Sequence, residues 1–250
     1  MSGHSHWATI KRKKGAIDAK RGKVFSKLTK AIMQAAKQGG GNPDMNLRLQ
    51  YAIEKGKQAN LPKDNIERAI KKATGEFESV NFEEFNYEGY GPGGAAIIME
   101  ILTDNRNRTA AETRKIFDKA GGNLGETGCV SWMFEKKGVI VVDHDSINED
   151  DLMTLVLDAG AEDMEKVEDT YQITCALSDF EPVKKILKDK NIDCNEAELS
   201  LIPTNSIELN EKDGQKMVGL MDTLENHDDI QNVYSNFTLS EKQLAEMQTE

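Results

Sequence analysis

Cysteine is scarce in this chain: Cys129, Cys175 and Cys194 are the only three among 250 residues, and they lie far apart. An odd, scattered set without a CxxC pair excludes a disulfide framework and a cysteine zinc site, and it favours a reducing compartment. No apolar run approaches the length of a membrane span. The basic first residues are not followed by the apolar segment of a secretory signal. We therefore expect a cytoplasmic protein with no membrane partner.

Histidine is also rare, with His4, His6, His144 and His227 as the only four. None has a spacing to cysteine, serine or aspartate that favours nucleophilic catalysis or zinc binding. The carboxylates are spread over expected helix faces and turns, which is typical of solubility charge rather than of an acid–base pair. We therefore expect no enzyme, no catalytic residues, no cofactor, no metal site and no small-molecule substrate.

Positive charge is concentrated at one end of the chain. The net charge is −11, but residues 1–74 contain 17 Lys and Arg against 5 Asp and Glu, or +12, and residues 75–250 contain the remaining 15 against 38, or −23. A basic module joined to an acidic body orients a molecule on a polyanion, because one end is attracted and the other is repelled.

The densest basic segment is residues 2–30, the basic arm, in which nine Lys and Arg accompany one acid, Asp18. Such a segment is typical of binding to nucleic-acid phosphates, with release of condensed counterions. Trp7 stands just before the cluster and could stack on an unpaired base. The alternative is a solvated leader that only keeps the protein soluble. The predicted nucleic-acid-binding residues of the arm are Trp7, Lys11, Arg12, Lys13, Lys14, Lys20, Arg21, Lys23, Lys27 and Lys30.

Helical periodicity predicts a three-helix bundle behind the arm. The first helix spans about residues 16–38, with Lys23, Lys27 and Lys30 beside its apolar stripe, and the Gly39–Gly41 run ends it. Asn42 and Pro43 predict the start of a second helix whose apolar stripe includes Met45 and Leu49. A third helix is expected after Leu61-Pro62, ending at Gly75.

The next segment, residues 76–94, is acidic and then glycine-rich, and we interpret it as a linker and a loop. Because it precedes a predicted strand at 95–102, it does not have the context of a nucleotide-binding loop. Thr109 and Glu112 predict a capping box for a helix from about residue 110 to 120. The preceding Asp104–Arg108 turn places Arg106 and Arg108 near a helix start, which suits a phosphate as a second nucleic-acid contact. An ordinary solvated turn is the alternative.

The rest of the chain predicts two α/β units. Val130, Trp132 and Phe134 are expected to alternate into a core, and residues 138–203 follow the order βαββαβ of a ferredoxin-like fold, with capping boxes at Ser146 and Ser178. Residues 206–237 supply a strand, a helix and a strand that would complete a second such set with residues 95–135. We therefore predict an α+β protein of these parts: a basic arm and bundle at 1–75, a discontinuous α/β domain at 76–137 plus 204–240, an inserted domain at 138–203, and a polar tail at 241–250.

Four long segments carry a family resemblance: SGHSHWATIKRKKGAIDAKRGKVFSKL, GGGNPDMNLRLQYAIEKGKQANLPKDNIERAIKKATG, YEGYGPGGAAIIMEILTDNRNRT and GGNLGETGCVSWMF. They resemble the YebC/PmpR family over essentially the whole chain. The resemblance implies a cytoplasmic DNA-binding transcriptional regulator in a three-domain layout, and some members act on translating ribosomes. It implies no catalytic residues.

These observations predict a nucleic-acid-binding regulator that contacts phosphates with little reading of bases. DNA is the expected partner. The first alternative is a translation factor that binds ribosomal RNA, tRNA or the ribosome, and the weaker one is an enzyme in the cleft between the two α/β domains.

Overall fold

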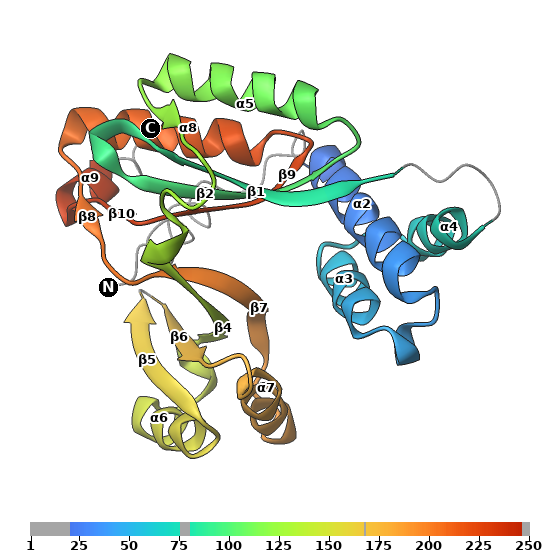
Figure 1. The fold of residues 1–250 in the computed structure, drawn as a ribbon. Coiled ribbons are helices and arrows are strands. Elements are labelled where there is room, and N and C mark those ends of the chain that lie inside the picture. The colour runs from blue at the N-terminus through green and yellow to red at the C-terminus, as the bar shows by residue number, and fades with distance from the viewer. Residues whose placement is uncertain (1–20, 76–80, 168, 247–250) are drawn as a thin grey trace. The chain divides into compact units, whose positions relative to one another are not determined.

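The computed structural model describes residues 21–75, 81–167 and 169–246, and these fall into two compact units. Of the described residues, the first unit contains 21–129 and 210–233, and the second contains 130–209 and 234–246. A helical N-terminal region is followed by antiparallel sheets with helices, so the predicted α+β class is confirmed (Figure 1).

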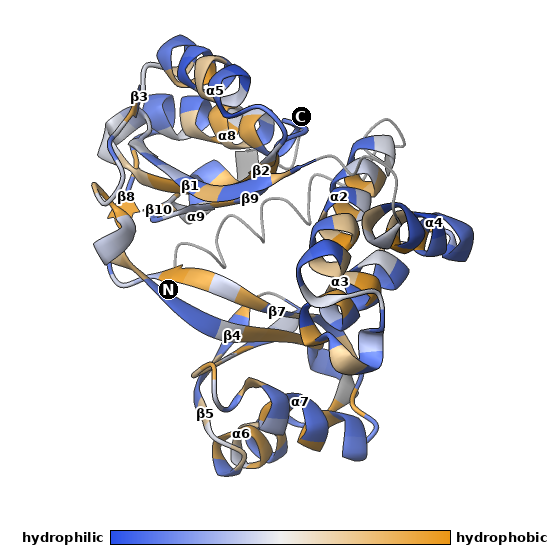
Figure 2. Ribbon diagram, turned by 45° about the vertical axis from the view of Figure 1, so that its right-hand side comes forward, coloured by the Kyte–Doolittle hydropathy of each residue, from blue (hydrophilic) through white to orange (hydrophobic). Residues whose placement is uncertain are grey.

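The first unit begins with the predicted bundle, formed by α2 (Arg21–Gly39), α3 (Leu47–Gln58) and α4 (Lys63–Thr74). Its core contains Ile32 and Ala35 from α2, Leu49 from α3, and Ile66 and Ala69 from α4. Each helix contributes its apolar stripe to this core, and in Figure 2 apolar residues alternate with polar ones along α2 and α3.

The start of the second bundle helix differs from the prediction. Asn42 caps only a short 3-10 turn, η2 (Pro43–Met45), while Asn46 caps α3 by accepting a hydrogen bond from Leu49 N at 3.1 Å. The Asn46 amide also donates to Ala35 O at 2.9 Å, which ties the turn to α2. Met45 therefore lies outside the apolar stripe and is 84% exposed, so its predicted core position is wrong.

An antiparallel sheet forms the rest of the first unit. It consists of β1 (Glu83–Tyr90), β2 (Ala96–Thr103), β3 (Asn123–Leu124) and β9 (Ile230–Ser235), in the order β3-β1-β2-β9. Helices α5 (Arg106–Ala120) and α8 (Glu211–Glu225) lie together on one face of it (Figure 1). Phe117 of α5 and Met217 and Met221 of α8 are fully buried there, as the apolar stripe of the second helix predicts.

The interpretation of residues 76–94 as linker and loop is wrong for its second half, because β1 occupies residues 83–90. This strand pairs with β2 along its whole length, from Glu83 opposite Thr103 to Tyr90 opposite Ala96. Its acidic residues hide the pattern, but Phe85 and Tyr87 have the aromatic side chains that favour strands.

The second unit contains residues 138–203, for which the sequence predicts a ferredoxin-like fold. Its elements are β4 (Phe134–Asp143), α6 (Glu149–Asp158), β5 (Ala161–Val167), β6 (Thr170–Cys175), α7 (Phe180–Asp189) and β7 (Cys194–Pro203). The sheet order β5-β6-β4-β7, with antiparallel neighbours, is that of a ferredoxin-like fold and confirms the prediction. Its core joins Ile140 and Val142 of β4 to Leu152 of α6 and Leu187 of α7.

Three local predictions in this unit are wrong. Trp132 lies in a 3-10 turn, η4 (Ser131–Met133), and is 69% exposed rather than in a core. Asn148 caps α6, and Asp179, rather than Ser178, is the residue before α7. At both helix starts a nearby residue that can also cap a helix takes the N-cap position.

The end of the chain adds a short parallel pair, β8 (Ile207–Glu208) with β10 (Phe237–Thr238), and a helix, α9 (Glu241–Glu246). The predicted polar tail is therefore helical over residues 241–246. Gln243 of this helix is buried and donates to Leu209 O at 3.2 Å.

The sheet of the first unit has four strands, like the ferredoxin-like sheet, but its strands follow one another along the chain in a different order. In the second unit the four positions are taken by β5, β6, β4 and β7, and in the first unit by β3, β1, β2 and β9. The missed strand β1 thus takes the position that β6 takes in the inserted domain. Residues 95–135 and 206–237 alone would lack this strand.

The nested domain layout stays a prediction, and the structure suggests where to cut. Phe134 pairs with Pro203, and Thr204 N donates to Met133 O at 2.8 Å, so the flanking residues are neighbours. Replacing residues 134–203 with two glycines is expected to leave a protein that melts cooperatively, and the excised piece should fold alone because its core is self-contained. Thermal denaturation followed by circular dichroism tests both pieces, and a non-cooperative melt of either would refute the layout.

Candidate nucleic-acid interface

Most of the predicted arm contacts lie outside the described residues. These are Trp7, Lys11, Arg12, Lys13, Lys14 and Lys20. Arg21 is the first residue of α2, and its side chain also falls outside the description. Their assignment to nucleic-acid binding stays a prediction.

The three remaining lysines of the arm contact the chain itself. Lys23 Nζ donates to Asn226 O at 2.9 Å, Lys27 Nζ to Glu225 O at 2.5 Å, and Lys30 Nζ to Asp228 O at 3.1 Å. The last carbonyls of a helix lack intrahelical donors and carry the negative end of its dipole, so ammonium groups are favoured there. Lys23 and Lys27 therefore stabilise the end of α8, while Lys30 binds the turn after it. A phosphate would compete with these carbonyl groups for the lysines.

Other basic side chains of the bundle face solvent. Exposed cations lie along α3 and α4, and α4 is mostly hydrophilic in Figure 2. Between residues 21 and 75 the sequence contains 12 Lys and Arg against 4 Asp and Glu, which gives the bundle a net charge of +8. The exposed cations are Lys55, Lys57, Lys63, Arg68, Lys71 and Lys72. Sequence analysis did not name them, although their clustering is visible in the charge count.

Arg106 and Arg108 lie in the first turn of α5, not in a turn before it. Asn105 is the N-cap, and its side chain accepts a hydrogen bond from Arg108 N at 3.1 Å. The predicted capping box at Thr109 is therefore wrong. Thr109 is fully buried inside the helix, and its hydroxyl points to Asp229 at 2.9 Å.

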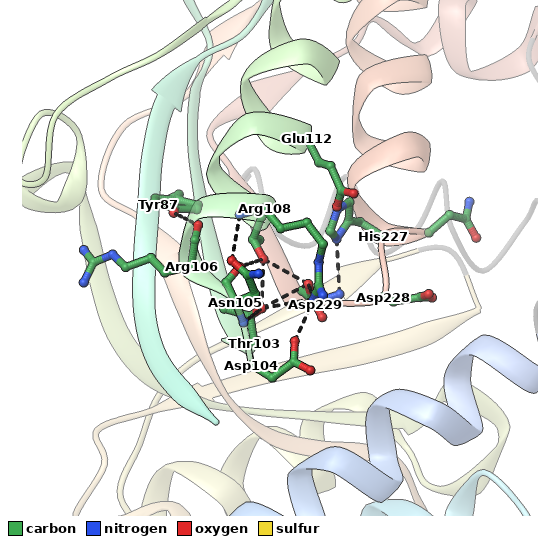
Figure 3. A network of polar contacts seen from close by, with 12 residues as sticks. Tyr87, Thr103, Asp104, Asn105, Arg106, Arg108, Glu112, His227, Asp228 and Asp229 are labelled. Carbon is green, nitrogen blue, oxygen red and sulfur yellow. Dashed lines mark hydrogen bonds and ion pairs between the residues drawn. The ribbon is translucent and has the colours of Figure 1, made fainter. Parts of the chain in front are cut away.

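Asp229 is the centre of the polar network in Figure 3 and is only 2% exposed. Its Oδ2 lies 2.7 Å from Arg108 Nη2 and 3.1 Å from the Thr103 hydroxyl, and its Oδ1 lies 2.8 Å from Lys30 Nζ. A buried carboxylate needs such partners, because an unpaired charge in the interior is very unfavourable. The network thus joins α2, the start of α5 and the turn before β9.

The pKa values follow from these contacts. Burial alone would raise the pKa of Asp229, but hydrogen bonds from Lys30, Arg108 and Thr109 outweigh it and hold that pKa well below the ordinary range. The hydrogen bond to Asp229, followed by that to Asp104, raises the pKa of Arg108 above its already high value. Arg108 is thus committed to two carboxylates, whereas a free arginine would be needed for a strong phosphate contact.

Arg106 points the other way, toward β1 (Figure 3). Its guanidinium lies 4.4 Å from the centre of the Phe85 ring, and Phe85 meets Tyr87 edge to face at 5.0 Å between ring centres. The Tyr87 hydroxyl donates to Arg106 O at 3.3 Å. An exposed arginine beside half-buried aromatic rings can stack with an unpaired base. Sequence analysis identified Arg106 but missed Phe85 and Tyr87, because it placed them in a linker.

One group of side chains has the composition of a metal site. Glu112, His227 and Asp229 place ligand atoms within 4.8 Å of one another. However, His227 Nδ1 accepts a hydrogen bond from Asp229 N at 3.1 Å, and Nε2 lies 2.9 Å from Glu112 Oε2, so both ring nitrogens are used. Lys30 and Arg108 already neutralise Asp229 and would repel a cation. The contacts of this group indicate that it holds the turn before β9 against α5 rather than binding a metal ion.

The glycine-rich segment after β3 is held by a buried acid, Glu88 of β1. Glu88 is 3% exposed, its carboxylate accepts from Gly128 N at 2.8 Å, and its backbone O accepts from Gly125 N at 2.8 Å. Gly128 has φ of +91°, which favours glycine. The segment from Gly125 to Gly128 is therefore anchored to β1. No sequence signal pairs a strand glutamate with that loop.

The fold and charge distribution define a class of protein in which a basic helical module is followed by two α/β sheets with helices. Family models agree over nearly the whole chain, with the TACO1/YebC protein N-terminal domain matching residues 5–76 and the TACO1/YebC second and third domain matching residues 82–237. The chain belongs to the TACO1/YebC family. The predicted family resemblance is thus confirmed.

The relatives that match this chain are named as regulators and not as enzymes. A "Probable transcriptional regulatory protein" of Desulfatibacillum aliphaticivorans is 53% identical over 98% of this chain and all of its own length. A protein of the same name from Pelotomaculum thermopropionicum is 53% identical over 96% of this chain and all of its own. Among solved structures, the conserved hypothetical protein Aq1575 of Aquifex aeolicus matches with a TM-score of 0.82 and 44% identity, covering 90% of this chain and 93% of that one. None of the helices described for this chain has the length and apolarity needed to cross a membrane.

Proposed function

We propose that this chain is a cytoplasmic DNA-binding regulator that grips phosphates with its basic arm and the exposed cations of the bundle. The observation that carries the proposal is the segregation of charge. The bundle has a net charge of +8 between residues 21 and 75, whereas residues 75–250 have −23. Phosphate contacts supply most of the affinity in such an interface, and the acidic remainder limits contact to one side.

The proposal predicts weak sequence discrimination. The densest basic run, Lys11–Lys14, is followed by Gly15 and Gly22, and an arm of this kind contacts backbone phosphates rather than base edges. We expect a genomic fragment recovered by crosslinking to be preferred over its scrambled version by well under ~10³-fold at physiological salt. Competition binding measures this ratio. A preference above that range would point to a base-reading element.

A ribosome-associated translation factor is the second candidate, and Arg106 favours it. An exposed arginine stacked on Phe85 beside Tyr87 suits the unpaired bases of structured RNA more than duplex DNA. Sedimentation of the protein with ribosomes in lysate, run beside the competition assay, separates the two functions. Ribosome association without fragment preference would make translation the main function, and the reverse result would favour DNA.

The Arg106→Ala variant tests this second contact. We expect it to weaken binding to a structured RNA by about 1–3 kcal/mol if a base stacks there, while the melting temperature changes little because the side chain is exposed. Arg108→Ala is a poor variant for this purpose, since it removes a partner of buried Asp229. Arg114→Ala on the same helix is the matched control, and equal losses for both arginines would exclude a specific role for Arg106.

A further inference from the structure

The connection between α2 and α3 carries two exposed apolar side chains. Met45 is the last residue of η2 and is 84% exposed, and Leu47 is the first residue of α3 and is 59% exposed. Single exposed apolar residues are common on protein surfaces, but two large ones within three residues form a small apolar patch. We call this pair the apolar tip of the bundle.

Asn46, between the two apolar residues, fixes the backbone of the apolar tip. Its side chain is buried, and the amide donates to Ala35 O at 2.9 Å and to Gly40 O at 2.8 Å. The amide oxygen accepts from Leu49 N at 3.1 Å. A side chain with these three bonds holds the turn to the end of α2 and to the start of α3. The apolar tip is therefore presented to solvent by a rigid turn and not by a mobile loop.

The glycine run that ends α2 is needed to build this turn. A Cβ at Gly39 would lie 2.6 Å from Asn46 Nδ2, and a Cβ at Gly41 would lie 3.1 Å from the Ile70 side chain of α4. Gly40 has φ of +86°, which favours glycine. The run therefore does more than stop a helix, because it lets the turn approach Asn46 and the end of α4 closely.

Exposed cations lie at the same end of the bundle as the apolar tip. They come from the last turns of α2 and α4 and from the first turn of α3, and they are Lys37, Lys71, Lys72 and Arg48. Arg48 also pairs with Glu84, and Asp44 is the acid within the turn. Positive charge still dominates, since the whole bundle has a net charge of +8 between residues 21 and 75. This end of the bundle therefore combines an apolar pair with attraction for a polyanion.

We propose that the apolar tip is a wedge that enters a base step of duplex DNA from the minor groove, while the cations beside it contact the flanking phosphates. Methionine and leucine are among the side chains that insert between base pairs, unstack them in part and kink the duplex. Insertion removes both side chains from water and places them against base faces. A polyanion with an apolar interior accounts for the apolar pair and for its cationic surroundings together. This inference rests on the proposed DNA-binding function and adds how the duplex is held.

A wedge selects DNA by how easily it deforms and not by its base edges. TA steps unstack readily, whereas A-tracts are stiff and have a narrow minor groove. The full-length protein should therefore prefer a duplex with a central TA step to an A-tract duplex of equal length. Competition between these two duplexes measures the preference, and equal affinities would overturn insertion at a base step.

Removing both apolar side chains tests the wedge directly. The probe is a duplex in which 2-aminopurine replaces the adenine of the central TA step, because its fluorescence rises when the base unstacks. We expect the wild-type protein to raise this fluorescence and the double variant Met45→Ala, Leu47→Ala to lose the rise and about tenfold in affinity. The slope of log affinity against log salt should stay the same, since no cation is removed. The melting temperature should change little, because both side chains are exposed.

The second unit offers a matched control with the same two residue types. Met153 and Leu157 lie one turn apart on α6 and are 37% and 46% exposed, so Met153→Ala with Leu157→Ala removes the same side chains elsewhere. We expect this control to bind like the wild type, and equal losses in both variants would overturn the wedge. Wild-type binding without a fluorescence rise would overturn the wedge and leave the proposed function standing, whereas no duplex binding would overturn both. A loss of affinity confined to a structured RNA would overturn the assignment to duplex DNA.

Discussion

Replacing Lys11, Arg12, Lys13 and Lys14 together with glutamine is expected to weaken binding to any duplex or RNA and to flatten its salt dependence. Each phosphate contact contributes about 0.7–0.9 to the slope of log affinity against log salt. Four lost contacts would therefore reduce the slope by about 3. The measurement is the affinity for one duplex over a series of salt concentrations.

The matched control replaces four lysines on and just after α7 of the second unit with glutamine: Lys184, Lys185, Lys188 and Lys190. The change in net charge is the same, so both variants alter long-range attraction equally. We expect the control to keep the wild-type slope. A slope that stays unchanged in the arm variant would refute phosphate binding by the arm.

Local signals predicted the helices and the inserted sheet well. The spacing of apolar residues over short stretches predicted the apolar stripe of α2 and the βαββαβ order of residues 138–203. Both are confirmed. Strand β1 was missed because its acids resemble a linker. Its Glu88 is nevertheless buried, since it bonds to Gly128 some forty residues later in the chain. Such a pairing has no short-range sequence signal.

Helix starts show the same limit. Thr109 with Glu112 fits a capping box, yet Asn105 caps α5 because Thr109 is needed in the interior beside Asp229. The Lys30–Asp229 ion pair joins residues 199 positions apart. Sequence analysis identified Lys30 and Arg108 as cations but assigned both to phosphate, because nothing nearby in the chain reveals their carboxylate partner.

Asp229→Asn is expected to cost about 2 kcal/mol of unfolding free energy and to lower the melting temperature by about 4–8 °C. The asparagine would keep the shape but would leave Lys30 and Arg108 without their shared anion in a buried setting. We place the cost below that of a fully buried pair, because both cations are partly exposed and can contact water. Chemical denaturation at pH 7 measures the loss. Asp104→Asn is the control, since this exposed acid also pairs with Arg108 but should cost less than about 1 kcal/mol.

The pH dependence of the same variant gives an independent test of the ion pairs. The folded-state pKa of Asp229 lies below the value of about 3.9 expected for an unfolded aspartate, so its charge stabilises the folded state at every pH above that value. As pH falls below about 4, the unfolded state takes up a proton first, and this stabilisation is lost progressively toward the folded-state pKa. The gap in unfolding free energy between wild type and Asp229→Asn should therefore be constant from pH 5 to 7 and should narrow below about pH 4. Asparagine cannot titrate, so a gap that stays constant down to pH 2 would mean that packing, and not the charge of Asp229, holds α2, α5 and the turn before β9 together.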